Sequence, residues 1–269
     1  MRTAKILTLA AFLIAAALGT TAFINAKHTN VPIADNKGFA LIELYTSEGC
    51  SSCPPADELV AKIQKENADK PVYILAYHVD YWNRLGWKDQ FSSADFSKRQ
   101  NEYANYLNIN SVYTPQIVVN GRTEFVGSEE GTLRNAIRTN LQKSSSAQLD
   151  LSVSATNSSH ADLKYTTQGA DKSTVLQVAV LQKNAQTKVL RGENGGHTLS
   201  HVQIVRELQE VSLKGNNGIA NITLPHGFDT QNWEIMGFLQ NTSNGAIIAA
   251  SRVSFTGEAG IGAMVKSSK

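Results

Sequence analysis

Residues 41–57, LIELYTSEGCSSCPPAD, are the stretch that decides the fold. An apolar run stops at Gly49, Cys50 and Cys53 follow with C-x-x-C spacing, and two prolines then suit the start of a helix. These are the only 2 cysteines among 269 residues, so they do not staple distant segments together. The pattern favours a redox pair on a strand–turn–helix corner, while the spacing alone also allows a metal site or a local staple.

Composition sets the broad class of protein. Hydrophobic residues make up 42% of the chain and charged residues 18%, which is typical of a globular protein with a sizeable core. The length is sufficient for two domains of ordinary size. The net charge is +2, and no long basic run or basic–aromatic interleaving occurs, so we expect no nucleic-acid partner.

The N-terminal residues 1–26 have the order of a secretory signal. Arg2 and Lys5 precede an apolar run at 6–18, and small residues follow it. The alternative is an uncleaved anchor, because residues 6–24 are just long enough to span a bilayer. Both interpretations predict an exported chain, periplasmic or secreted, whose membrane contact is restricted to this segment.

Residues 38–142 predict an α/β domain with the order β-α-β-α-β-β-α. Nearly continuous apolar runs at 39–46 and 72–79 are typical of parallel strands covered on both faces. Apolar stripes at helical spacing, and an Asn-Gly turn between two short apolar runs, predict the other elements. These are helices at 56–67, 95–107 and 128–141 and a hairpin at 116–126.

The second half of the chain has a different composition. After a serine-rich linker at 143–146, apolar and polar residues alternate in short runs that are separated by turn signals. Seven or eight such runs predict short antiparallel strands. We therefore expect residues 147–255 to form an all-β, sandwich-like domain.

The predicted order of elements in the first half resembles the thioredoxin fold. More closely, the segments ELYTSEGCSSCPPAD, HVDYWNRLGWKDQFS, RQNEYA and VYTPQIVVNG look like the exported family called domain of unknown function 1223. RGENGGHTLSHVQIVREL resembles the C-terminal region of that family, so the likeness covers residues 38–255. The resemblance implies a thioredoxin-like fold, and it implies an activity only through thioredoxin-like chemistry.

The resemblance gives each cysteine a role. Cys50 would be the nucleophile, because unpaired N–H groups and the dipole at a helix N-terminus favour its thiolate. Cys53, one turn further in and less exposed, would resolve the mixed disulfide that Cys50 forms with a substrate. The alternative is an inert disulfide or a buried thiol pair.

Thr114-Pro115 matches a second feature of the resemblance. Thioredoxin-like folds place a cis-proline beside the dithiol, and the preceding residue offers backbone groups to the substrate. The resemblance therefore implies a cis bond before Pro115, with Thr114 beside the substrate. The alternative is a trans proline that starts an edge strand.

Two further residues are candidates for the site. Glu43 interrupts a strand covered on both faces, where a carboxylate is costly unless it is protonated or paired. The resemblance implies that Glu43 transfers protons beneath Cys53, and the alternatives are a structural acid or a strand-edge residue that reaches water. His78 ends the second strand, where open α/β sheets build sites, and it is chemically able to accept a proton, stabilise a thiolate or bind metal. A hydrogen-bonded structural histidine is the alternative.

Two loops surround these candidates. Tyr81, Trp82 and Trp87 would form an aromatic lip for a partner, or else a small satellite core. The Gly-rich residues 191–197 lack the pattern of a phosphate loop, and we expect them to fold over the dithiol face and narrow it. His197 and His201 have helical zinc-ligand spacing, but their segment is typical of loop and strand.

The leading hypothesis is an exported thiol–disulfide oxidoreductase. It would act through Cys50 and Cys53 on a protein or small-thiol substrate, without a cofactor or resident metal. Because the chain has no further cysteines, a partner protein would have to recharge it. The alternatives are a copper or zinc metallochaperone, although copper carriers of this fold use a longer cysteine spacing, and a partner-binding module with a vestigial dithiol.

Overall fold

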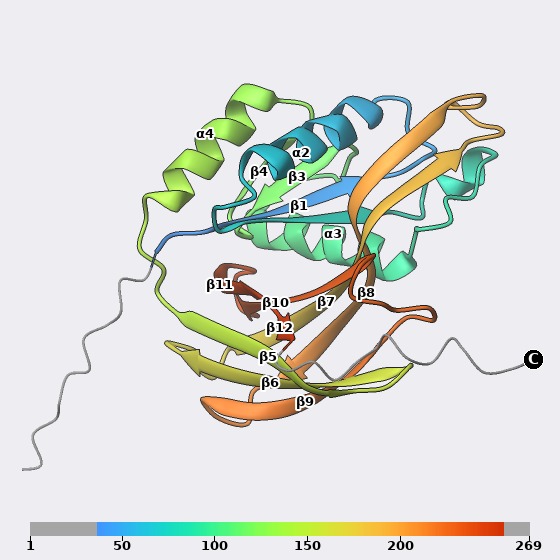
Figure 1. Ribbon diagram of the computed structural model, residues 1–269. Coiled ribbons are helices and arrows are strands. Elements are labelled where there is room, and N and C mark those ends of the chain that lie inside the picture. The colour runs from blue at the N-terminus through green and yellow to red at the C-terminus, as the bar shows by residue number, and fades with distance from the viewer. Residues whose placement is uncertain (1–36, 256–269) are drawn as a thin grey trace, which may run out of the picture. The chain divides into compact units, whose positions relative to one another are not determined.

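The structure is a computed structural model that describes residues 37–255 (Figure 1). The predicted signal or anchor at 1–26 lies outside the described residues. Within 37–255, no helix is both long and apolar enough to cross a membrane.

The stretch at 41–57 forms a strand, a turn and the start of a helix. Strand β1 (Ala40–Thr46) is buried at every position and pairs in parallel with β2 (Val72–His78). Helix α2 (Pro54–Glu66) connects the two strands, with Cys53 at its N-cap. Its two leading prolines lie in the first turn, where a missing backbone N–H costs no intrahelical bond.

The next four elements complete this layer of the molecule. They are α3 (Ala94–Leu107), β3 (Gln116–Val119), β4 (Thr123–Val126) and α4 (Glu130–Leu141). A short 3-10 helix, η2 (Asn83–Leu85), precedes them. Strand β3 pairs antiparallel with β1, and β4 follows it at the sheet edge.

The turn between β3 and β4 has two successive residues with positive φ angles. Asn120 and Gly121 have φ angles of 50° and 65°, as a type I′ turn requires. A Cβ on Gly121 would lie 2.0 Å from the carbonyl oxygen of Gly245.

We therefore expect Gly121→Ala to lower the free energy of unfolding by about 2 kcal/mol or more, measured by urea denaturation. Gly131→Ala, where an added Cβ meets nothing within 4 Å, is the control, and equal losses in both variants would contradict the prediction.

Residues 148–255 form eight strands. They are β5 (Gln148–Thr156), β6 (His160–Gln168), β7 (Thr174–Lys188), β8 (Thr198–Ser212), β9 (Asn217–Thr223), β10 (Trp233–Asn241), β11 (Ile247–Arg252) and β12 (Ser254–Phe255). Four of them extend the first sheet into an eight-stranded sheet with the order β11-β10-β7-β8-β2-β1-β3-β4. The other four form a sheet with the order β12-β5-β6-β9, which Figure 1 shows below the large sheet.

The large sheet crosses the expected domain boundary. Strand β8 joins β2 in parallel through Ala76 and Ile204, so the linker at 143–146 does not separate two sheets. All described residues fall within one compact unit. Alternation of apolar and polar residues identifies a strand but not its partner, so this pairing has no local signature.

Three apolar cores follow from the alternation of side chains along the strands. Ile42 and Leu44 of β1 face the core under α2 and α4, whereas Leu41 and Tyr45 face the core that contains α3 side chains. The third core lies between the two sheets and contains apolar side chains of β5, β6, β7 and β10. Strand β7 contributes to two cores, which explains its nearly continuous apolar sequence.

Candidate functional site

The C-x-x-C segment is closed by a disulfide at the start of α2. Cys50 and Cys53 are bonded to each other, with their Cα atoms 5.4 Å apart. Both cysteines are 0% exposed, whereas Ser51 and Ser52 between them are exposed. The expected difference in exposure between the two cysteines is therefore wrong, because both are completely covered.

Thr114 and Pro115 lie beside this segment. Their peptide bond is cis, as the family resemblance implied. The Ser52 hydroxyl donates to the Thr114 carbonyl over 3.4 Å. A Cβ built on Gly127 would lie 3.0 Å from Pro115 and 3.2 Å from Ala56 in the first turn of α2, which places the proline close to the helix start.

The loop that carries Tyr81, Trp82 and Trp87, which we call the tryptophan loop, contacts residues of the site. The indole N–H of Trp82 donates to the Thr114 hydroxyl over 2.8 Å, and that of Trp87 donates to the Glu48 carboxylate over 2.7 Å. Tyr81 donates its hydroxyl to Gln100. Both tryptophans are half-buried, and Tyr81 and Trp82 pack against the core that contains α3 side chains, so they do not form a separate satellite core. The aromatic lip for a partner stays a prediction.

Behind the disulfide loop lies a buried group of charged side chains that we call the acid–histidine cluster: Glu48, Asp57, His78, Asp89 and His201. His201 stands between two carboxylates, with Nε2 3.5 Å from Glu48 Oε1 and Nδ1 3.9 Å from Asp57 Oδ1. These separations are electrostatic contacts, because neither ring nitrogen has a hydrogen-bond partner. Glu48 and Asp57 flank the two cysteines in sequence, so the cluster places charge next to the redox segment.

The protonation of His201 follows from this position. Burial lowers the pKa of His201, but the carboxylates of Asp57 and Glu48 outweigh it and raise the pKa to about 9. The imidazole is therefore a cation at neutral pH and compensates two buried carboxylates.

His78 lies in the same cluster and is linked to the disulfide loop by hydrogen bonds through Asp89. Its Nδ1 is 2.7 Å from Asp89 Oδ2, which also accepts the Glu48 backbone N–H over 2.8 Å. Burial opposes ionisation of Asp89, but His78 and two backbone N–H groups hold the pKa of that carboxyl below its ordinary value. The His78 ring also packs edge-on against His201, at a centroid distance of 4.8 Å. His78 is thus a hydrogen-bonded residue that positions the loop.

Glu43 lies on the other face of β1, so the expected proton transfer beneath Cys53 is wrong in its geometry. Its carboxylate accepts from Arg99 Nε over 2.7 Å and from the Tyr103 hydroxyl. Both partners come from α3, whereas the cysteines precede α2. Because adjacent strand residues point to opposite faces, Leu44 and not Glu43 faces α2.

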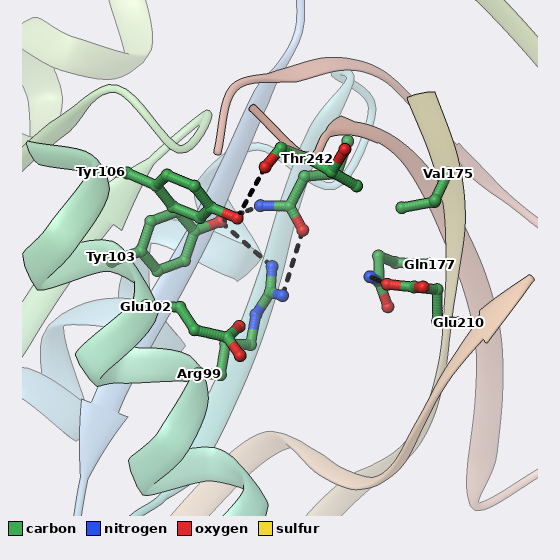
Figure 2. A pocket seen from close by; sticks show the side chains of 9 residues that line it. Arg99, Glu102, Tyr103, Tyr106, Val175, Gln177, Glu210 and Thr242 are labelled. Carbon is green, nitrogen blue, oxygen red and sulfur yellow. Dashed lines mark hydrogen bonds between the residues drawn. The ribbon is translucent and has the colours of Figure 1, made fainter. Parts of the chain in front are cut away.

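Arg99 joins α3 to the second half of the chain, as Figure 2 shows. Its guanidinium donates to Tyr103 and to Gln240 of β10, each over 3.1 Å. A small cavity of about 50 Å³ adjoins this network, and Figure 2 shows Gln177 and Glu210 on its far side. None of the residues that line this cavity belongs to the C-x-x-C segment.

The Gly-rich loop folds onto the C-x-x-C segment, as the sequence predicted. The Asn194 side-chain amide donates to the carbonyl oxygens of Glu48 and Cys50, each over 2.9 Å. The Glu193 carboxylate accepts from the Ser51 N–H over 3.0 Å and from the Ser51 hydroxyl over 2.7 Å. Hydrogen bonds to the two Ser51 groups also lower the pKa of Glu193, so its carboxylate is ionised at neutral pH.

Sequence reasoning missed most residues of the acid–histidine cluster. Asp57 is a favourable acidic residue near a helix start, an arrangement that does not by itself indicate a site, and Glu48 carries no signal beyond its nearness to Cys50. The sequence pairs His201 only with His197, by zinc-ligand spacing, but His197 is exposed while His201 is buried. Among residues 37–255, no group of three or more His, Cys, Asp or Glu side chains is arranged to hold a metal ion.

Fold and site together define a mixed α/β protein with a covered C-x-x-C disulfide at a helix N-terminus. Residues 41–240 match the family described as "Protein of unknown function (DUF1223)", and the chain belongs to this family. No curated protein matched the chain.

Comparison with solved structures gives one substantial likeness. The crystal structure of a protein from Agrobacterium tumefaciens is similar, with 28% identity, a TM-score of 0.62, and coverage of 82% of this chain and 96% of that one. A β-glucosidase from Kluyveromyces marxianus aligns with 16% identity over 49% of this chain and 18% of the β-glucosidase chain. Its TM-score of 0.20 does not indicate a shared fold.

Proposed function

We propose that this protein is an exported thiol–disulfide oxidoreductase built on a thioredoxin-like fold. The observation that carries the proposal is the Cys50–Cys53 disulfide at the N-terminus of α2, with Thr114 within hydrogen-bonding reach of the same segment. The element order from β1 to α4 supports the fold assignment. The order of charged, apolar and small residues in 1–26 supports export, and disulfides persist in oxidising compartments.

The proposed reaction exchanges one disulfide for another. In the reducing direction, the Cys50 thiolate attacks a substrate disulfide, forms a mixed disulfide and releases one substrate thiolate. The Cys53 thiolate then attacks Cys50, so that the Cys50–Cys53 bond forms and the second substrate thiolate leaves. Two electrons pass from the protein to the substrate, and the oxidising direction is the reverse. A separate redox partner restores the starting state.

The test compares cysteine variants of the mature protein. We expect wild type to exchange disulfides with a model substrate such as insulin, and Cys50→Ser to lose this activity completely. Cys53→Ser should accumulate a mixed disulfide through Cys50, detectable as added mass that dithiothreitol removes. The double variant Cys50→Ser with Cys53→Ser is the control and should trap nothing. Equal rates in wild type and Cys50→Ser would refute the proposal.

The complete burial of both cysteines favours a second candidate, a partner-binding module whose disulfide only fixes the loop. In that case the disulfide would contribute to stability without turnover. Wild type would then show no exchange, Cys53→Ser would trap no substrate, and binding of the partner would persist in Cys50→Ser.

A further inference from the structure

The connection between β7 and β8, residues 189–197, forms a compact tip that we call the cap. Val189 donates its N–H to the His197 carbonyl over 2.9 Å and accepts from the Gly196 N–H over 2.8 Å, so the cap has its own hydrogen bonds. Gly192 has a φ of 78°, and a Cβ there would lie 3.2 Å from Trp87 Cβ. The cap is therefore an ordered element in contact with the tryptophan loop.

The cap touches the C-x-x-C segment through two polar side chains. Asn194 donates to the carbonyls of Glu48 and Cys50, and Glu193 accepts from the Ser51 backbone and hydroxyl. These bonds satisfy backbone groups on both sides of Cys50. They are also contacts that water can replace, because each protein–protein hydrogen bond contributes only modestly over its hydrated form.

The burial pattern shows what these contacts cover. Asn194 is 5% exposed, although its neighbours Glu193 and Gly195 are exposed. Cys50 and Cys53 beneath it are 0% exposed. An incoming thiolate must reach a sulfur atom to form a new S–S bond while the Cys50–Cys53 bond breaks, and neither cysteine is accessible while the cap is bonded to the Cys50 segment.

We infer that the cap is a displaceable cover over the dithiol, and that Asn194 and Glu193 determine access of thiols to Cys50. This inference rests on the proposed function for its biological meaning. Whatever the biological role, reduction of the protein's own disulfide requires the Asn194 and Glu193 contacts to break. Stem residues of the same hairpin, such as Gln186, take no part, because Gln186 bonds to Ser200 within the stem.

The experiment measures the rate at which dithiothreitol reduces the Cys50–Cys53 disulfide, by acid quenching and mass-spectrometric counting of free thiols. In Asn194→Asp a carboxylate would face two carbonyl oxygens, so the cap should open and the rate should rise by at least about ten-fold. Glu193→Ala should raise it by about three-fold or more, and its exposed position does not threaten folding. Gln186→Ala is the matched control and should stay within about two-fold of wild type.

Unchanged rates in Glu193→Ala and Asn194→Asp would overturn the inference, as would an equal rise in Gln186→Ala. If Asn194→Asp fails to fold, Glu193→Ala alone decides the question. The readout needs no substrate turnover. A protein without oxidoreductase activity can still have a capped disulfide, and an active enzyme with unchanged variant rates would have no such cover.

Discussion

Replacing Arg99 by methionine should lower the free energy of unfolding by about 3 to 5 kcal/mol. Arg99 and Glu43 are both buried, and their ion pair has N–O contact at 2.7 Å. Burial opposes the charge on Arg99, but Glu43 and the surrounding tyrosines raise the pKa of Arg99 above its ordinary value. Removing the guanidinium leaves the Glu43 carboxylate buried without its counter-ion, which is the costly outcome.

Two controls separate the loss of charge from the loss of packing. The double variant Glu43→Met with Arg99→Met removes both charges and should recover most of the lost stability, because a buried ion pair is often replaceable by apolar groups. Arg134→Met removes two ion pairs, to Glu66 and to Glu130, whose side chains are 37% to 45% exposed, and solvent screening should make its effect much smaller. Urea denaturation measures all three variants, and a double variant as unstable as Arg99→Met would contradict the argument.

A substitution of Glu43 tests whether this residue is a structural partner of Arg99 or a proton-transfer group for the cysteines. Glu43→Gln should destabilise the protein for the reason given for Arg99. In the folded fraction, however, it should leave the rate of thiol exchange unchanged, because its partners are on α3 and not beside the cysteines. A slower exchange rate in the folded variant would restore the proton-transfer hypothesis.

Raising the pH from 6.5 to 9 should remove about 3 kcal/mol of stability through His201. The ordinary pKa of histidine is about 6.5, and in the folded protein the carboxylates of Asp57 and Glu48 raise the pKa of His201 to about 9. Because the folded pKa lies above the unfolded one, the contribution is fully present below about pH 6.5. It declines as the pH rises through the folded pKa, where the imidazole loses its proton and leaves two carboxylates without their counter-charge.

The measurement is urea denaturation at several pH values and constant ionic strength, with the disulfide intact so that no thiol titrates. His201→Gln is the matched variant, and its stability should change much less over this range. The titratable groups that contact His201 are Glu48, Asp57 and His78, and the Phe91 ring also packs against it. Parallel pH curves for wild type and His201→Gln would show that His201 does not carry the effect.

Local sequence was sufficient for the elements of the first half. The prolines and Cys53 place the start of α2, because proline is tolerated only where an N–H bond is not needed. Asn120-Gly121 gives the hairpin, because only such residues take two successive positive φ angles cheaply. The match of residues 41–240 to the DUF1223 family also depends on the sequence alone.

Tertiary structure decided the site. Glu43 was assigned the wrong neighbours because a one-residue difference on a strand exchanges the two faces of the sheet. Glu48, Asp57 and His201 meet because β8 pairs with β2 and carries His201 behind the disulfide segment, a pairing that leaves no local signature.

The residue order along 41–57 thus determined a strand, two cysteines at a turn and a helix that begins at prolines, since backbone preference and spacing are local properties. Only the folded chain decided that both cysteines are buried, and that Asn194, more than 140 residues further along, is bonded to the carbonyl of Cys50. Burial and charge compensation depend on which residues pack against a given residue in the folded chain, and local sequence does not determine those neighbours.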